Sequence, residues 1–294
     1  MKSTLGLSII LVSFLVTSLA VASSPFVVAH RGDEQMHPEN SVDAFLNAAG
    51  FKADYVEMDI RRTQDGVFVI HHDERTGRSV QCDLGEVAIS ETTSKYLKES
   101  CRYGESPLGR DQVLTLSETL ELMRWTNAGL VLDVKPDIKE TEMNQLAQTL
   151  IALDPQGSCL RGMDPGGTFN CFSNVIIYVN NLPAHDRLWR MVKGIEKSKT
   201  SFKVLANMKF LKIVYSAKDA LIQPEKYLDN DGISFNLLNS TMADTIELRR
   251  RYPNKILAGW TLDNSQQFAY AESLSLDGVI VSKLHDYLEF LKGK

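Results

Sequence analysis

Short apolar runs rich in Val and Ile alternate along the chain with longer segments in which apolar residues recur at helical spacing. That alternation is typical of repeated β-α units that build a parallel sheet. It predicts principal strands at residues 26–30, 54–60, 130–134, 175–179, within 202–215, and at 232–236, 256–260 and 278–281. Helices with one apolar face are predicted between them, for example at 41–49, 116–125 and 141–153. Because α/β barrels of about 250 residues fold as one unit, the pattern predicts a single (β/α)8 TIM barrel.

An additional apolar run at 67–71 follows the second strand after only Thr63-Gln64-Asp65-Gly66. A parallel crossover needs about a dozen or more residues, so this run is predicted to turn back as a hairpin. Asp65-Gly66 supplies the positive φ that such a turn needs, and the hairpin would carry His72 over the barrel mouth. Residues 73–115 show no clean strand pattern and are predicted to form an insertion.

The N-terminal segment has a positive charge at Lys2, an apolar run from Leu5 to Ala20 and small residues up to Ala22. This pattern is typical of a secretory signal peptide, and the run is shorter than the roughly 20 apolar residues of a membrane span. We therefore expect a signal peptide at 1–22 and a barrel domain at 23–294. The mature protein is expected to be periplasmic or secreted, with no integral membrane segment.

Composition and charge narrow the function classes. Hydrophobic residues make up 44% of the chain, enough to form a core. The formal net charge is -5, and loss of the single positive charge of Lys2 makes it -6, which argues against a nucleic-acid partner but permits a local phosphate site. An oxidising compartment would favour disulfides among the cysteines, and the local pairs Cys82–Cys101 and Cys159–Cys171 are preferred because nearby residues meet at little entropic cost.

Reactive side chains cluster where the first three predicted strands and the hairpin end, which is where barrel enzymes place their active sites. The first strand ends in His30-Arg31-Gly32 and the second in Glu57-Met58-Asp59. The hairpin ends in His71-His72-Asp73 and the third strand in Asp133-Val134-Lys135.

Glu57 and Asp59 are two residues apart in a predicted strand, so both side chains point to the same face. A buried acidic pair is tolerable when a cation neutralises it, and Asp133 of the next strand could complete an all-oxygen site for Mg²⁺ or Ca²⁺. One alternative is an acidic pair that faces solvent, which would turn Val56 and Met58 into the barrel. The spacing also fits the paired carboxylates of a glycosidase.

Histidine titrates near neutrality, so two histidines on either side of a phosphodiester can remove one proton and deliver another. His30 is one candidate, and the adjacent His71 and His72 supply the other. Neighbouring residues of an extended segment point to opposite faces, so only one of this pair is expected to reach the site. Strand parity alone does not choose between them.

Arg31 and Lys135 are suited to phosphate oxygens, Arg through a two-pronged contact and Lys as a point charge. They also balance the charge of the carboxylates, and the two roles are compatible. Glu39 precedes a predicted helix that begins near Ser41. The Glu39-Asn40-Ser41 segment therefore either caps this helix through Asn40 or Ser41, or places Glu39 so that it orients the site.

The first half of the chain resembles the glycerophosphodiester phosphodiesterases. The similarity is carried by HRG, five residues and PEN in HRGDEQMHPENSVDAF, followed by ADYVEMDIRRTQDGVFVIHHD, LTLSETLELM and VLDVKP. In the second half, AGWTLDN and LDGVIVSKLHDYLEFL resemble the closing elements of the family. The resemblance implies a barrel enzyme that uses one divalent cation, Ca²⁺ or Mg²⁺. It also implies a small-molecule phosphodiester substrate, hydrolysed to glycerol 3-phosphate and an alcohol.

The resemblance also implies residue roles. The acid and base would be His30 and the histidine immediately before Asp73, which is His72. The metal ligands would be Glu57, Asp59 and Asp133. Phosphate would be bound, or its ligands oriented, by Arg31, Glu39 and Lys135, and Trp260 would line the mouth beside the alcohol part of the substrate.

Some positions depart from the family pattern. Asp133 stands where the family more often has Glu, and the shorter side chain at this position also resembles secreted sphingomyelinase D and phospholipase D relatives. Those relatives lack the Pro38-Glu39-Asn40 motif, so a secreted phospholipase D, sphingomyelinase D-like or lysophospholipase D activity is the second hypothesis. Asp263 and Ser282-Lys283 replace the more usual Asn and Thr-Asp, which leaves the alcohol group open. A non-catalytic exported binding module is the third hypothesis.

Overall fold

The computed structural model describes residues 24–104, 112–153, 174–193, 205–227 and 229–293. The expected signal peptide and the expected Cys159–Cys171 pair lie outside these residues. Among the described helices, none combines the length and the apolar character needed to cross a bilayer.

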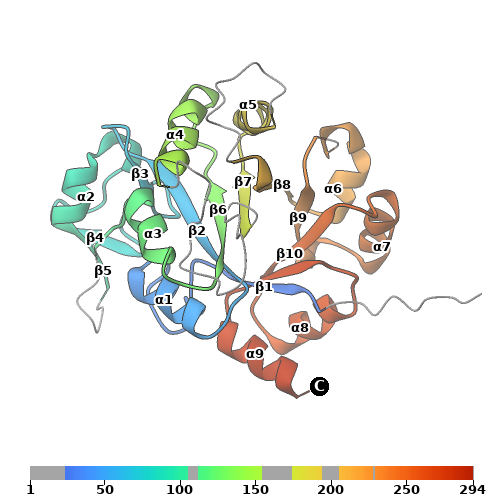
Figure 1. Cartoon of the computed structure of the whole chain (residues 1–294). Coiled ribbons are helices and arrows are strands. Elements are labelled where there is room, and N and C mark those ends of the chain that lie inside the picture. Colours follow the sequence, from blue (N-terminus) through green and yellow to red (C-terminus); the bar gives the residue numbers. More distant parts are fainter. Residues whose placement is uncertain (1–23, 105–111, 154–173, 194–204, 228, 294) are drawn as a thin grey trace, which may run out of the picture.

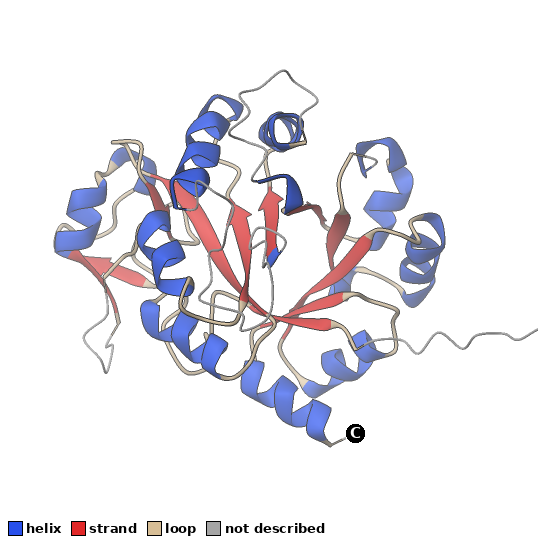
Figure 2. Cartoon of the chain, viewed as in Figure 1, coloured by secondary structure: helices blue, strands red, loops and turns tan. Residues whose placement is uncertain are grey.

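Parallel strands close into a barrel surrounded by helices (Figures 1 and 2). The strands are β1 (Phe26–Ala29), β2 (Tyr55–Arg62), β6 (Gly129–Val134), β7 (Val175–Val179), β8 (Lys209–Val214), β9 (Gly232–Asn236), β10 (Ile256–Leu262) and β11 (Gly278–Val281). Their order is β1-β11-β10-β9-β8-β7-β6-β2, and a β1–β2 pairing closes the ring. The predicted (β/α)8 TIM barrel is therefore confirmed.

The helices of the outer layer follow the strands in the chain. They are α1 (Val42–Gly50), α3 (Leu116–Met123), α4 (Met143–Leu153), α5 (Leu182–Val192), α6 (Ala217–Ile222), α7 (Met242–Arg251), α8 (Ser265–Glu272) and α9 (Leu284–Lys292). Each of the helices predicted at 41–49, 116–125 and 141–153 is present, with ends that differ by one or two residues.

Alternation along the strands sorts side chains into two apolar layers. Val56, Met58 and Ile60 of β2 belong to the layer between the barrel and the helices. Residues such as Val28, Val131, Ile176, Leu211 and Ile280 fill the barrel interior. Because the apolar residues of β2 face outward, Glu57 and Asp59 must point into the barrel.

Strand β2 is longer than predicted and ends at Arg62. Its last three residues pair antiparallel with β3 (Phe68–Ile70), which confirms the hairpin. Glu57 and Asp59 therefore lie within β2 and not at its end, which corrects the prediction. The physical reason is that the hairpin partner supplies hydrogen bonds beyond the point where β2 leaves the barrel wall.

The insertion after the hairpin has its own small core. It contains β4 (Val80–Cys82) and β5 (Cys101–Tyr103), which pair antiparallel, with α2 (Ser94–Ser100) between them. A disulfide joins Cys82 to Cys101, as expected for this local pair. Strands of three residues are too short to give a recognisable sequence pattern, which is why the sequence predicted only an insertion here.

Candidate active site

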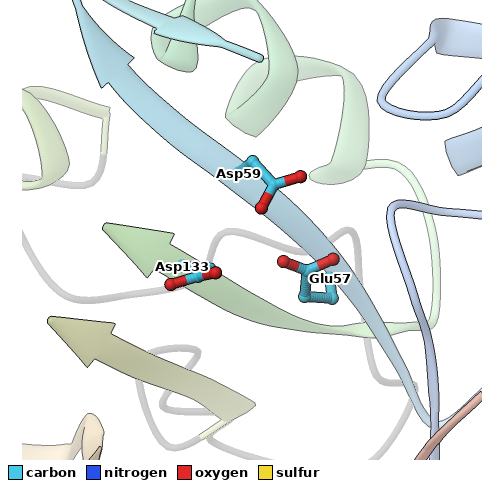
Figure 3. A group of neighbouring side chains, drawn as sticks. All are labelled: Glu57, Asp59 and Asp133. Atoms are coloured by element: carbon cyan, nitrogen blue, oxygen red, sulfur yellow. The ribbon is translucent and has the colours of Figure 1, made fainter. Parts of the chain in front are cut away.

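Three carboxylates meet inside the barrel at the level where β2 and β6 run side by side (Figure 3). Asp59 is in register with Asp133, and Glu57 lies one inward-facing position earlier on β2. Ligand oxygens of all three lie within 4.8 Å of one another. Glu57 and Asp59 are 3% and 1% exposed. The expected acidic group is therefore assembled, and the solvent-facing alternative is wrong.

Two cations and an amide surround Asp59. The Lys135 ammonium lies 2.5 Å from Asp59 Oδ1 and 2.6 Å from Asp133 Oδ2. The Arg31 Nε lies 3.3 Å from Asp59 Oδ2, and Asn40 Nδ2 donates to the same oxygen at 2.7 Å. Burial opposes ionisation of Asp59, but Lys135 and Arg31 outweigh it and hold the pKa of this carboxyl well below its usual range.

No lysine or arginine in the described part of the chain forms an ion pair with Glu57, unlike Asp59. Its polar contact is with the backbone of Arg31, whose N–H donates to Glu57 Oε2 at 2.7 Å. Burial and the neighbouring Asp59 and Asp133 raise the pKa of Glu57 well above its ordinary value. A buried carboxylate between two others is what a divalent cation would neutralise, and oxygen ligands suit Mg²⁺ and Ca²⁺. The donor set therefore fits a hard divalent cation.

Two imidazoles from separate segments face the same cavity. His30 follows β1, and its Nδ1 lies 2.6 Å from Glu34 Oε1 and 3.2 Å from Ser282 Oγ. His72 follows the β3 strand, and its Nδ1 lies 2.7 Å from Asp73 Oδ1. A carboxylate at Nδ1 favours the tautomer with its proton there, which leaves Nε2 as the proton acceptor.

His71 and His72 point in opposite directions, as strand alternation predicts. The His71 side chain is buried, its Nδ1 lies 2.8 Å from the Asp73 carbonyl oxygen, and it does not line the cavity. His72 lines the cavity and is 33% exposed. The structure thus separates the two histidines that parity alone could not.

The cavity at the barrel mouth has a volume of about 290 Å³, close to the lower limit of about 300 Å³ typical of small-molecule sites. The charged part of its lining is made by His30, Arg31, Glu57, His72, Asp133 and Lys135. The lining also includes Tyr178, Ile213, Trp260 and Ile280. The cavity can accept an anionic centre beside the charged residues and an uncharged part beside the aromatic and aliphatic ones.

Two of the predicted site residues, Glu39 and Asp59, lie behind the cavity wall. Glu39 accepts a hydrogen bond from Arg31 Nη1 at 2.9 Å, so it orients this guanidinium. The helix cap is Ser41, whose hydroxyl accepts from the backbone N–H of Ala44. Both alternatives predicted for this segment are therefore present: Ser41 caps the helix, and Glu39 orients Arg31.

Sequence reasoning missed two amides of the site. Asn40 adopts a positive φ of 59° and, besides its bond to Asp59 Oδ2, accepts from the Asp59 backbone N–H at 3.1 Å. Asn180, after β7, donates to Asp133 Oδ1 at 2.6 Å and lines the cavity. The residue type of Asn40 could have indicated its role, because Asn just before a helix tolerates the positive φ that turns its side chain toward the site. Nothing in the sequence around Asn180 distinguished it.

Residues 30–156 match the model of the glycerophosphoryl diester phosphodiesterase family. A glycerophosphodiester phosphodiesterase of Caldanaerobacter subterraneus subsp. tengcongensis is 36% identical over 100 residues, which cover 33% of this chain and 40% of that protein. One of Arabidopsis thaliana is 23% identical over 262 residues, covering 88% of this chain and 70% of the relative.

Solved structures share the fold over nearly the whole chain. A phosphodiesterase of Oleispira antarctica, in complex with the product sn-glycerol-3-phosphate, aligns with a TM-score of 0.71 at 18% identity and covers 91% of this chain and 97% of that one. A glycerophosphodiester phosphodiesterase of Thermotoga maritima aligns with a TM-score of 0.60 at 20% identity, covering 92% and 99%.

Proposed function

We propose that the chain belongs to the glycerophosphodiester phosphodiesterase family, whose model matches residues 30–156, and that it hydrolyses glycerophosphodiesters to glycerol 3-phosphate and an alcohol. The observation that carries the proposal is that two carboxylate-held imidazoles, His30 and His72, line one cavity together with Glu57 and Asp133, two members of the acidic triad. The relative from Oleispira antarctica, which holds sn-glycerol-3-phosphate, supports the same substrate class.

Glu57, Asp59 and Asp133 hold one divalent cation, Ca²⁺ or Mg²⁺. When bound, such an ion acts as a Lewis acid that offsets negative charge developing on phosphoryl oxygens. The amides Asn40 and Asn180 each fix one of these carboxylates, so the triad is oriented by the protein itself.

His30 and His72 move the protons. One imidazole accepts a proton at Nε2 from the attacking hydroxyl, and the other donates a proton to the leaving alcohol. Each ring is oriented by its acidic partner, Glu34 or Asp73. Burial lowers the pKa of His72 below its usual value, while the neighbouring Asp59 and Asp73 carboxylates oppose this effect.

Arg31 and Lys135 bind phosphate oxygens in this proposal. Both line the cavity, and both are held by carboxylates that lie behind them or beside them. Burial alone would lower the pKa of Lys135, but Asp133 and Asp59 raise it well above its ordinary value, so its ammonium stays charged. Preorganised positive charge of this kind stabilises a phosphoryl transition state without reorganisation.

Trp260 contributes to the wall that receives the alcohol part of the diester. The cavity of about 290 Å³ suits a deacylated diester such as glycerophosphocholine or glycerophosphoethanolamine better than a two-chain lipid. Export from the cytoplasm is part of the proposal. It is supported by the N-terminal pattern and by the Cys82–Cys101 disulfide, because disulfides persist in oxidising compartments.

Product analysis on a panel of diesters tests the proposal. The panel contains glycerophosphocholine, glycerophosphoethanolamine and a lysophospholipid, each with added Ca²⁺ or Mg²⁺ and with chelator. We expect glycerol 3-phosphate from the deacylated diesters, loss of turnover with chelator, and a fall of about 100-fold or more in kcat for His30→Ala. His37→Ala, which removes a histidine of the same loop that does not line the cavity, is the matched control. Turnover that is indifferent to chelator and to His30→Ala contradicts the proposal.

A further inference from the structure

A guanidinium from the insertion reaches the residues behind the catalytic wall. Arg78 Nη1 donates to Glu39 Oε2 at 2.7 Å, and Arg78 Nη2 donates to Glu39 Oε1 at 2.5 Å. The third nitrogen, Nε, donates to Asp73 Oδ2 at 2.6 Å. All three nitrogens of one side chain are therefore used on two carboxylates that are far apart in the sequence.

These two carboxylates each orient a residue of the cavity wall. Asp73 uses its two oxygens on different partners: Oδ1 contacts His72 Nδ1, and Oδ2 accepts from Arg78 Nε. Glu39 contacts Arg31 with Oε2 while its Oε1 accepts only from Arg78 among the contacts described. Arg78 thus connects the support of the imidazole to the support of the phosphate-facing guanidinium.

The charge balance behind the wall depends on Arg78. Glu39 is mostly buried, at 10% side-chain exposure, and burial alone would raise the pKa of its carboxyl. The Arg78 hydrogen bonds and Arg31 reverse this and lower that pKa below its ordinary value. Burial also opposes ionisation of Asp73, but Arg78 and His72 lower its pKa to about 2. Without Arg78, two carboxylates would share one remaining guanidinium and one imidazole.

The insertion holds the backbone of Arg78 in place. Gly77, with a φ of 114°, donates its backbone N–H to the Val80 carbonyl oxygen, which makes a tight turn around Arg78. Strand β4 follows directly and is joined to β5 by pairing and by the disulfide. The Arg78 backbone is therefore anchored to a small folded unit and not to a loose loop, although its side chain is 51% exposed.

We propose that Arg78 is a positioning residue for the reaction, because it fixes His72 through Asp73 and Arg31 through Glu39. The inference rests on the proposed function and deepens it. It gives the insertion a role in catalysis, because this segment supplies a side chain that connects Asp73 to Glu39. A lysine at this position would keep the charge but not the fork that grips both oxygens of Glu39.

The test compares Arg78→Ala, Arg78→Lys and Arg75→Ala. Arg75 is the matched control because it lies in the same insertion, is 52% exposed and pairs with Glu86, away from the cavity. We expect Arg78→Ala to lower kcat/KM by about 10- to 100-fold, with kcat reduced and KM raised, since supports of site groups typically have effects of this size. Arg78→Lys should recover part of the loss. Arg75→Ala should match the wild type, and both Ala variants should unfold at similar temperatures.

A second readout does not depend on turnover. ¹⁵N NMR of the histidine rings should show mainly the Nδ1–H tautomer of His72 in the wild type and in Arg75→Ala, and a mixture in Arg78→Ala. Equal kinetics for Arg78→Ala and Arg75→Ala, or a loss that follows only the unfolded fraction, overturns the inference. If the wild type turns over no diester, the proposed function fails, and the NMR comparison alone decides the role of Arg78.

Discussion

Replacing Glu57 by Gln distinguishes the effect of the acidic triad on the stability of the metal-free protein from its effect on metal binding. The amide has nearly the same shape and can still accept the Arg31 backbone N–H that now bonds to Glu57. It cannot carry the negative charge that lies within 4.8 Å of the Asp59 and Asp133 carboxylates. The change should therefore remove a metal ligand charge while relieving repulsion in the metal-free protein.

With an effective dielectric constant of about 20, an ionised Glu57 at 4.8 Å from each of the other two carboxylates is repelled by about 3 kcal/mol by each. Together with burial, this repulsion raises the pKa of Glu57. Lys135, which lies against Asp59 and Asp133, offsets part of this, so Glu57→Gln should leave metal-free stability unchanged or raise it. Metal at about 100 times its Kd adds about 2.7 kcal/mol to the free energy of unfolding of the wild type. At about 2–4 °C per kcal/mol, that is a rise of about 5–11 °C in Tm.

Thermal unfolding followed by calorimetry, with chelator and with a titration of Ca²⁺ or Mg²⁺, measures both effects. The wild type should gain Tm with metal, and Glu57→Gln should gain little or none. The exposed Glu140→Gln should behave as the wild type does, which controls for the loss of one negative charge. An equal metal-dependent gain in Glu57→Gln, or a clear loss of its metal-free stability, would refute the reasoning.

Three further predictions follow from other parts of the molecule. Burial lowers the pKa of His185 from 6.5 to about 4. The unfolded chain therefore binds a proton at this residue more readily than the folded protein does, so the free energy of unfolding is unaffected above pH 6.5 and falls as the pH drops toward 4. The loss is about 3 kcal/mol, and acid unfolding of His185→Gln should lack this component. Replacing Cys82 and Cys101 by Ala should lower stability by about 3 kcal/mol for a loop of about 20 residues, measured by urea unfolding under oxidising conditions. His72→Ala should lower kcat by about 100-fold or more, whereas His71→Ala should act mainly on Tm; equal kinetic losses would contradict the assignment.

The barrel could be predicted because its strands are continuous apolar runs, and the interior triad because Val56 and Met58 alternate with two acids. The same alternation predicted that His71 and His72 diverge, and the structure confirms this. The resemblance then named His72, which is also the one that lines the cavity. These features depend on how apolar and polar residues alternate within one short segment, and that alternation can be read directly from a sequence.

Other features depend on contacts between distant segments, and these the sequence did not display. Arg78 lies 39 residues from Glu39, in an insertion whose strands are too short to show a period. Asn180, which follows β7, contacts Asp133 of the neighbouring strand β6, 47 residues away. The end of β2 was placed too early because Arg61 and Arg62 are charged. Their guanidinium groups form ion pairs with Asp137 and Glu142, which allows β2 to continue through both residues.

The most direct test of the account is anomalous diffraction from crystals grown with Mn²⁺ and sn-glycerol 3-phosphate, since Mn²⁺ prefers the same oxygen ligands as Mg²⁺ and Ca²⁺. We expect one strong Mn²⁺ peak bound by Glu57, Asp59 and Asp133, with the phosphate between His30 and His72. A phosphate bound elsewhere, or an Mn²⁺ peak away from the three carboxylates at saturating metal, would contradict it.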